Sequence, residues 1–249
     1  MSTGNRTTVV VIAHNYGRYL AMAVASAVEQ TRRPHVLIMD DGSTDDTEEV
    51  VRELTARYPD LTCHRSPRPR GLAETRNDAA RRVDTEWIVY LDADDWLDLR
   101  FIEHGERWLE HHPKCDALTT DMTIVRDGRG PAVFKARAPK SWQGVLRRNT
   151  VVQTSFIRRS MILALSGYDG TFEYEDWEFW IRALKAGHSI GRLPGAHVFR
   201  REHGLNKSKT CDEALATRAV QERHPAPSRW AALRSLATTI RPPGRSKAP

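Results

Sequence analysis

Three aspartates, Asp92, Asp94 and Asp95, lie almost side by side directly after the apolar run WIVYL. Carboxylates this close repel one another, and each resists ionisation unless a positive charge is near. Residues two apart on a strand point the same way, so Asp92 and Asp94 are able to face one cation. Mg²⁺ or Mn²⁺ suits them, because these ions take a few protein carboxylates together with the phosphate oxygens of a nucleotide diphosphate. The alternative is a solvated acidic turn in which Asp98 caps the next helix.

A second acidic pair, Asp40 and Asp41, ends another apolar run and precedes Gly42. A carboxylate here could accept hydrogen bonds from a base N–H or a ribose hydroxyl. An Asx-type turn explains the same residues equally well. The pattern therefore favours neither interpretation by itself.

A third pair, Glu175 and Asp176, opens a predicted helix among aromatic residues. Acids are common in the first turn of any helix, which is one explanation. A catalytic role requires that one of them lie near an acceptor hydroxyl. Partial desolvation by Tyr174 and Trp177 would then raise its pKa and make it a better base. Further on, His203 is a weaker candidate for a diphosphate contact.

The elements that must position these residues alternate in type along the first hundred residues. Short apolar, β-branched runs alternate with amphipathic stretches, and Ser43 and Thr44 are N-cap candidates for the second helix. This alternation predicts a parallel sheet covered by helices on both faces, with ligands bound beyond the carboxyl ends of its strands. The polar clusters 14–15, 40–41 and 92–95 all fall at such ends. The predicted strands are 7–13, 35–40, 61–66 and 86–92, and the predicted helices are 18–30, 42–58 and 71–83.

The second half is less regular. Residues 116–136 resemble a hairpin around the turn RDGRG, and 151–159 are a predicted strand. Residues 175–187 are a predicted helix with its apolar residues on one face. After residue 205, helical stretches broken by prolines lead to an Arg/Pro/Lys tail that we expect to be disordered.

The composition bounds the class of protein. A chain of 249 residues with 40% hydrophobic residues forms one large domain, or one domain with an appendage. A net charge of +6 falls short of a dedicated nucleic-acid binder. No apolar run is long enough to span a bilayer, and the N-terminus has no signal-peptide core. Three widely spaced cysteines favour reduced thiols in a cytoplasmic protein.

Five segments, taken together and in this order, strongly resemble the family 2 nucleotide-sugar glycosyltransferases with the GT-A fold. They are VVVIAHNYGRYLAMAVASAVEQT, VLIMDDGSTDDT, GLAETRNDAARRVDTEWIVYLDADDW, EYEDWEFWIRALKAGH and REHGLNKS, and the resemblance covers about residues 7–210. It implies an α/β fold with a Rossmann-like, mostly parallel sheet flanked by helices, a smaller mixed sheet on the acceptor side, and C-terminal helices. Residues 1–115 would bind the nucleotide-sugar donor, 116–205 would carry the acceptor site and catalytic base, and 206–249 would form a helical extension and basic tail.

The resemblance also implies roles for the donor-side residues. Asp41, or its neighbour Asp40, would hydrogen-bond the base, usually a uracil in this family. Arg76 resembles the family's basic contact near the phosphates. Ile12 and His14 depart from the Pro or Thr and the Tyr that the family often has there. The remaining donor-side positions are Ala13, His14 and Asn15 near the base, and Asp92, Ala93 and Asp94 as the DXD motif. The metal ligands would come from Asp92, Asp94 and the neighbouring Asp95, with His203 as a late metal or diphosphate contact.

The implied reaction is metal-assisted single displacement with inversion, in which Asp176 is the general base and Glu175 its substitute. A UDP-sugar would donate a hexosyl or N-acetylhexosaminyl group to a glycan, a small molecule or a carrier-bound acceptor, with Mn²⁺ or Mg²⁺. Two alternatives are a sugar-phosphate nucleotidyltransferase and an inactive nucleotide-sugar binding module. The first would favour a Gly- and Arg/Lys-rich phosphate loop after the first strand, which AHNYGRYL lacks.

Partners are less constrained by the sequence. The basic C-terminus would attract an acidic carrier protein or an anionic lipid surface, and a solvated tail explains the same charges. Trp142 and Trp230 are candidates for an acceptor groove or a homodimer contact.

Overall fold

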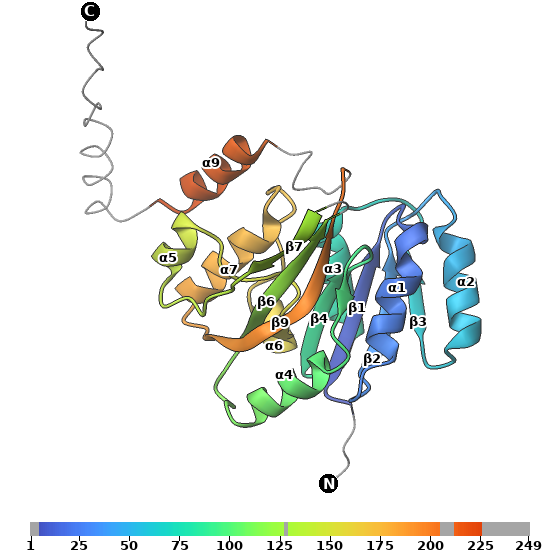
Figure 1. Cartoon of the computed structure of the whole chain (residues 1–249). Helices are drawn as coiled ribbons and strands as arrows, with labels where there is room; N and C mark the ends of the chain where they lie inside the picture. The colour runs from blue at the N-terminus through green and yellow to red at the C-terminus, as the bar shows by residue number, and fades with distance from the viewer. Residues whose placement is uncertain (1–4, 127–128, 205–211, 226–249) are drawn as a thin grey trace, which may run out of the picture.

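The computed structural model describes residues 5–126, 129–204 and 212–225, which form one α/β unit (Figure 1). The strands are β1 (Thr7–Ala13), β2 (His35–Asp40), β3 (Thr62–Arg65), β4 (Trp87–Asp92), β5 (Trp96–Leu97), β6 (Ala117–Arg126), β7 (Arg129–Phe134), β8 (Phe156–Arg158) and β9 (Ile190–Glu202). The helices are α1 (Gly17–Val28), α2 (Thr47–Arg57), α3 (Leu72–Arg82), α4 (Phe101–Glu110), α5 (Trp142–Arg147), α6 (Arg159–Ala164), α7 (Glu175–Lys185) and α9 (Glu213–Arg223).

The first half is the parallel sheet that the sequence predicts. Strands β3, β2, β1 and β4 lie in this order, and Val10 of β1 pairs with Leu37 on one side and Tyr90 on the other. Residues alternate between the two faces of the strands, and both faces are buried. One face packs against α1, α2 and α4, and the other packs against α3, α6 and α7. All four predicted strands and all three predicted helices of this half are present.

The predicted caps of the second helix are wrong. Helix α2 begins at Thr47, and neither Ser43 nor Thr44 caps it. Ser43 instead accepts a hydrogen bond through its hydroxyl from the backbone N–H of Asn15, at 2.9 Å. Asp45 accepts the backbone N–H of Gly17, at the start of α1, at 3.2 Å. The polar residues before α2 therefore connect two loops rather than cap a helix.

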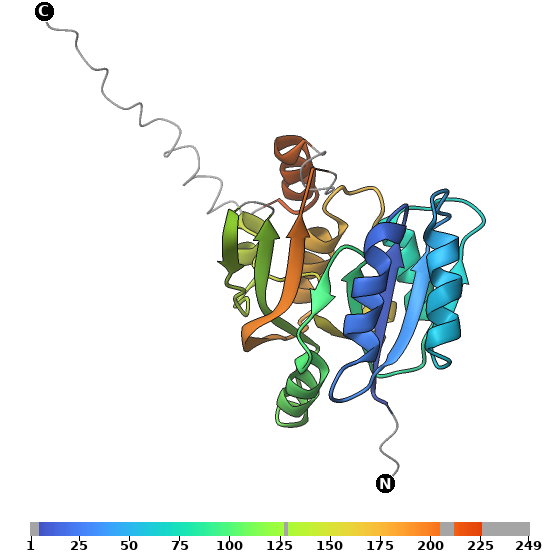
Figure 2. The same cartoon turned by 45° about the vertical axis from the view of Figure 1, so that its right-hand side comes forward.

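The second half continues the same sheet with mixed strand directions. Strand β8 pairs antiparallel with β4 and β6, and the long strand β9 runs parallel to β6 (Figure 2). The predicted hairpin is present as β6 and β7. The strand predicted over 151–159 is shortened to Phe156–Arg158, because residues 151–155 form a buried connection in front of it. The mixed strands are therefore joined to the parallel half through β8.

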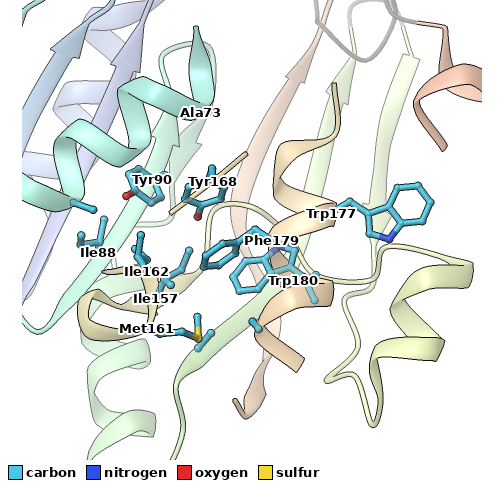
Figure 3. Close-up of a cluster of buried hydrophobic side chains, with 14 of the residues drawn as sticks. Ala73, Ile88, Tyr90, Ile157, Met161, Ile162, Tyr168, Trp177, Phe179 and Trp180 are labelled. Carbon is cyan, nitrogen blue, oxygen red and sulfur yellow. The ribbon is translucent and has the colours of Figure 1, made fainter. Parts of the chain in front are cut away.

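Aromatic side chains connect the two halves beneath α7 (Figure 3). Tyr90 on β4 meets Tyr168 edge to face at a centroid distance of 5.8 Å, and Tyr168 stacks on Phe179 of α7 at 4.4 Å. Phe179 in turn packs against Trp180. Each such pair contributes about 0.5–1.5 kcal/mol beyond the burial of its area. The cluster therefore fixes the start of α7 relative to the end of β4.

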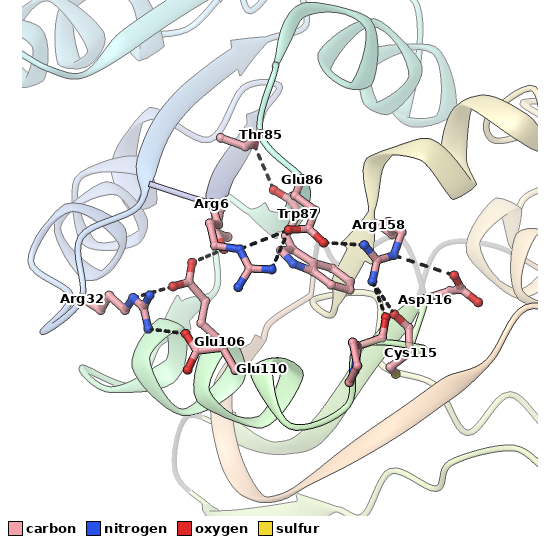
Figure 4. Close-up of polar contacts among 12 residues, drawn as sticks. Arg6, Arg32, Thr85, Glu86, Trp87, Glu106, Glu110, Cys115, Asp116 and Arg158 are labelled. Atoms are coloured by element: carbon pink, nitrogen blue, oxygen red, sulfur yellow. Dashed lines mark hydrogen bonds and ion pairs between the residues drawn. The ribbon is translucent and has the colours of Figure 1, made fainter. Parts of the chain in front are cut away.

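Ion pairs occupy the opposite, amino-terminal ends of the same strands (Figure 4). Glu86 lies between Arg6, whose Nη2 is 2.6 Å from Oε2, and Arg158. Buried Glu106 accepts from the hydroxyl of Thr7 at 2.5 Å. These contacts tie β1, β4, β8 and α4 together, and we assign them a structural role.

No helix in the described part of the chain is long and apolar enough to span a bilayer. Helix α9 confirms helical structure after residue 205. The predicted disordered tail, including Trp230, lies outside the described residues.

Candidate active site

The three polar strand ends meet on one rim of the sheet. Ala13 at the end of β1 pairs with Asp40 at the end of β2, and Ile12 pairs with Asp92 at the end of β4. The backbone continues this pairing for one residue, since Ala93 donates to the carbonyl of Ile12 at 3.0 Å. The register thus brings together residues that lie far apart in the sequence. The sequence predicts this convergence from strand order alone.

Hydrogen bonds interlock the loops after β1 and β2. Asn15 adopts a positive φ of 58° and accepts the backbone N–H of Thr44 at 2.8 Å through its side-chain oxygen. Asparagine tolerates this left-handed conformation better than most residues do. His14 Nδ1 lies 2.8 Å from the carbonyl oxygen of Asp41 and donates to it. The contact of His14 and Asn15 with the nucleotide base stays a prediction. In the structure both residues join the loop after β1 to the loop after β2.

The carboxylates of Asp40 and Asp41 are buried and engaged by the protein. Asp40 accepts the backbone N–H of Ser43 at 2.9 Å, three residues on, whereas an Asx-type turn would use the N–H two residues on. Asp41 accepts the backbone N–H groups of Arg70 and Gly71 at 2.9 and 2.8 Å, one on each oxygen. Both acids therefore shape the loops around the rim. Any contact of Asp41 with a base would use its remaining lone pairs.

The three aspartates after β4 differ in their surroundings. The side chain of Asp92 is 45% exposed, whereas that of Asp94 is 11% exposed and contacts His203, with Oδ2 at 2.9 Å from Nε2. Asp95 is buried and accepts the backbone N–H of Arg201 on β9 at 3.0 Å. Asp95 therefore anchors β9, while Asp92 and Asp94 remain as candidate ligands. A freely solvated acidic turn does not describe this segment.

The crowding of these acids affects their protonation. Burial, together with the charges of Asp94 and Asp92, holds the pKa of Asp95 well above its usual range. Desolvation also raises the pKa of Asp92; the charge of Arg76 opposes this rise, and the charges of Asp94 and Glu175 add to it. A cation placed between them would relieve this repulsion.

His203 is held against the rim by aromatic rings. Its imidazole stacks on Tyr19 of α1 at 5.3 Å and meets Tyr16 at 5.9 Å. Burial and the nearby charges of Asp94 and Asp92 raise the pKa of Tyr16 to about 12, so its phenol stays protonated. The structure thus places the late histidine beside the acids, more than a hundred residues away in sequence.

Arg76 lies behind the acids rather than on the surface. Its side chain is 2% exposed, its Nη1 is 2.6 Å from Glu175 Oε1, and its Nη2 is 3.6 Å from Asp92 Oδ1. The ring centres of Tyr90 and Tyr168 lie 5.9 and 5.4 Å from the guanidinium carbon and 5.8 Å from each other, so the two rings form one aromatic wall beside it. Burial alone lowers the pKa of Arg76, but the charges of Glu175 and Asp92 outweigh it and raise the pKa. The contact of Arg76 with a phosphate stays a prediction. In the structure the guanidinium instead links the carboxylates of Asp92 and Glu175.

The two acids at the start of α7 have different environments. Glu175 is buried in its ion pair with Arg76, whereas Asp176 is half-buried and accepts a hydrogen bond from Asn149 Nδ2 at 3.3 Å. Burial and the charge of Glu175 raise the pKa of Asp176 to about 6. Asp176 is therefore the better candidate for a group that takes up a proton near neutral pH. The sequence interpretation missed Asn149 and the two tyrosines around Arg76.

The protein alone does not form a complete metal cage on this rim. Within residues 5–126, 129–204 and 212–225, no three histidine, cysteine, aspartate or glutamate side chains converge on one ion-sized position. Asp92, Asp94 and His203 therefore do not meet at one position, and Mn²⁺ or Mg²⁺ held by any of them would need additional oxygen ligands. Phosphate oxygens are such ligands.

A sequence model described as "Glycosyl transferase family 2" matches residues 8–160. An Escherichia coli protein, UDP-Glc:alpha-D-GlcNAc-diphosphoundecaprenol beta-1,3-glucosyltransferase WfaP, is 24% identical over 185 residues, 72% of this chain and 70% of WfaP. Residues 1–349 of S. aureus TarS, solved with UDP-GlcNAc, match with a TM-score of 0.71 at 21% identity over 83% of this chain, and the match spans only 61% of that structure. A Pyrobaculum calidifontis mannosyltransferase, solved with GDP-Man and Mn²⁺, matches with a TM-score of 0.61 at 19% identity, over 95% of this chain and 81% of that one. These structural likenesses confirm the expected GT-A fold.

Proposed function

Because the chain belongs to glycosyl transferase family 2, we propose that it transfers a sugar from a nucleotide-diphosphate donor, a UDP-sugar, to a nucleophile of an acceptor. One observation carries this proposal. A single buried guanidinium, that of Arg76, connects the acidic rim at Asp92 with the acids that open α7. A donor site and a base site are thus held at a fixed separation. The UDP-GlcNAc and GDP-Man bound by the two similar structures support a nucleotide-sugar donor.

We assign the diphosphate to the rim of the sheet. Asp92, Asp94 and His203 would hold Mn²⁺ or Mg²⁺ together with the phosphate oxygens, and the Mn²⁺ in the mannosyltransferase structure supports this choice. The bound ion would stabilise the negative charge that develops on the departing phosphate. Ala93 separates the two carboxylates, and Asp95 holds β9 in place so that His203 reaches Asp94.

We assign the proton transfer to Asp176. An acceptor hydroxyl attacks the anomeric carbon as the bond from that carbon to the diphosphate oxygen breaks, and the hydroxyl proton passes to the carboxylate of Asp176. One displacement of this kind inverts the configuration of the sugar and needs no covalent intermediate. Glu175 is poorly suited as the base, because its charge is already neutralised by Arg76 at 2.6 Å.

We assign the acceptor-binding site to the second half of the chain. We keep the proposed division into a donor half (1–115), an acceptor and base half (116–205) and a C-terminal extension (206–249), since α7 and the connection before β8 both lie in the middle part. The acceptor classes are a glycan, a small molecule or a carrier-bound sugar. The name of WfaP describes transfer to a lipid-diphosphate-linked sugar, which supports the carrier-bound class.

A donor screen tests the proposal. The melting temperature of the protein is measured with UDP, GDP and TDP, each with Mn²⁺, and then with the corresponding nucleotide sugars. We expect UDP to stabilise most, and release of UDP from the stabilising sugar nucleotide then reports turnover. If no nucleotide raises the melting temperature and no nucleotide sugar is consumed, the proposed function is wrong.

Metal and nucleotide are expected to bind together. Because the described side chains do not form a full cage, Mn²⁺ alone and UDP alone should each shift the melting temperature little. Both together should stabilise strongly, by about 2.7 kcal/mol at a ligand concentration of 100 times Kd. EDTA should remove both the joint stabilisation and the turnover.

The matched variants are Asp94→Asn and Asp98→Asn. Asp94→Asn weakens a proposed metal ligand, so UDP and Mn²⁺ together should no longer raise the melting temperature. Asp98 lies four residues further on, where it accepts the backbone N–H of Arg100, so Asp98→Asn should keep the shift. Full turnover in EDTA, or an unchanged shift in Asp94→Asn, would contradict the proposed metal site.

A further inference from the structure

Asn149 makes a polar contact with the proposed base from a separate part of the chain. It lies in the connection between α5 and β8, 27 residues before Asp176, and its Nδ2 donates to Asp176 Oδ2 at 3.3 Å. The backbone N–H of Trp177 provides a second favourable hydrogen bond to this carboxylate. The contact with Asn149 therefore crosses from the connection to the first turn of α7.

The amide of Asn149 has a defined orientation. Its Oδ1 accepts the backbone N–H of Val151 at 3.1 Å, so the opposite end of the amide, the NH₂ group, faces Asp176. An NH₂ group donates and does not accept in such a contact. It therefore favours the ionised carboxylate of Asp176 over the protonated acid.

The connection that carries Asn149 is itself fixed. Val151 and Val152 are buried, and the backbone N–H of Val152 donates to the hydroxyl of Thr119 on β6 at 3.0 Å. The carbonyl of Thr150 accepts the backbone N–H of Arg137 at 3.1 Å. The donor Asn149 and the acceptor Asp176 thus lie in two different segments, and the segment that carries Asn149 is anchored to β6.

Helix α5, directly before this connection, is fixed to α7 as well. The indole Nε1 of Trp177, one residue after Asp176, donates to the carbonyl of Val145 at 2.7 Å. Lys185 near the end of α7 lies 4.4 Å from the ring centre of Trp142. The connection is therefore held relative to the acid it contacts.

We propose that Asn149 is a positioning residue that holds the carboxylate of Asp176 in one orientation and in its ionised form, which rests on the function proposed above. Four other charged or titratable groups also influence Asp176. They are Glu175 on α7 and Asp92 at the end of β4, which oppose ionisation, Arg76 on α3, which favours it, and the phenol of Tyr168. Asn149 adds a neutral donor to this set. It keeps a half-buried base available without placing a second cation beside the acceptor.

Two substitutions at Asn149 separate positioning from a merely structural role. Asn149→Ala removes both the donor to Asp176 and the acceptor for Val151. Asn149→Asp keeps an oxygen for the N–H of Val151 but replaces the donor with a repelling carboxylate. If Asn149 only holds the connection, Asn149→Asp should behave like the natural protein.

The measurement is the titration of Asp176 itself. Aspartate-selective ¹³C labelling of the carboxyl carbons, with the Asp176 resonance assigned by its absence in Asp176→Asn, reports this group without a substrate. We expect the midpoint to rise by about one pH unit in Asn149→Ala, because the ionised carboxylate of Asp176 loses a side-chain donor. The rise in Asn149→Asp should be larger. Thr150→Ala, which disturbs the same connection without touching Asp176, should leave the midpoint unchanged.

An unchanged midpoint in Asn149→Ala, in a protein that melts as the natural one does, would overturn the positioning role. Turnover of the donor found in the screen separates this outcome from a failure of the proposed function. Loss of turnover in Asp176→Asn together with an unchanged midpoint in Asn149→Ala would remove the role of Asn149 and leave the proposed base intact. If the proposal holds, the acidic limb of the pH–rate profile moves upward with the midpoint, and the Kd for UDP stays constant.

Discussion

Replacement of Asp176 by asparagine is expected to lower kcat for sugar transfer by about 10²–10⁴-fold, the contribution of a positioned general base. Asparagine has nearly the same shape as aspartate but takes up no proton. It should leave UDP binding unchanged, because the residues proposed to hold the metal and the diphosphate, Asp92, Asp94 and His203, follow β4 and β9 and do not lie on α7. The measurement is kcat with the donor from the screen, together with the Kd for UDP from calorimetry.

The same assignment predicts the pH dependence. A base works only when it is deprotonated, and burial beside Glu175 raises the pKa of Asp176 to about 6. The rate should therefore fall as the pH drops through about 6 and level off above 7. Glu173→Gln, an exposed position three residues earlier, is the matched control and should keep normal turnover. Normal turnover in Asp176→Asn would show that the base lies elsewhere.

Removal of the Arg76 guanidinium is expected to have the largest effect on stability. Arg76→Met should lower the free energy of unfolding by about 3–5 kcal/mol, the usual result of leaving a buried charge without its partner. The uncompensated charge is Glu175, whose side chain is 5% exposed. Urea unfolding at neutral pH measures the loss.

Two comparisons make this result specific. Arg6→Met breaks the pair with Glu86, in which the side chains are 40% and 35% exposed, and should cost only about 0–1 kcal/mol. The double variant Arg76→Met, Glu175→Gln removes both charges and should recover much of the loss, since residues in contact do not act additively. A loss in Arg76→Met no greater than that in Arg6→Met would contradict the buried link.

The sequence predicts the parallel half of the fold well because its strands have a simple pattern. Strands β1, β2 and β4 are continuous apolar runs buried on both faces, whereas β3 is short and mostly exposed. The predicted ranges 35–40 and 86–92 agree with the structure to within one residue. The same order predicts that Asp40 and Asp92 end on one rim. The caps at Ser43 and Thr44 were wrong because their propensity for helix caps competes with hydrogen bonds to the neighbouring loop.

The position of Arg76 was partly accessible from the sequence. It follows Ala73 by three residues and precedes Ala79 and Ala80 by three and four, so helical spacing places it on the face that the sheet buries. A charged residue on such a face requires a buried partner, and Glu175 is that partner. The local pattern does not show which residue is this partner, because the contact between Arg76 and Glu175 depends on tertiary structure.

Other contacts of the site had no local signal. Asn149 meets Asp176 across a connection that lacks regular structure, and no periodicity links the two. Asp95 appeared equivalent to its neighbour Asp94 in sequence. Only the pairing of β5 with β9 shows that one acid faces a strand and the other faces His203.

The most direct test of the account is a crystal structure of the protein with UDP and Mn²⁺, with the manganese located by its anomalous scattering. The account predicts one manganese peak beside Asp92, Asp94 and His203, with the diphosphate bound to it and Asp176 on the far side of the sugar position. A nucleotide bound away from this rim, or manganese bound without contact to any of the three residues, would contradict it.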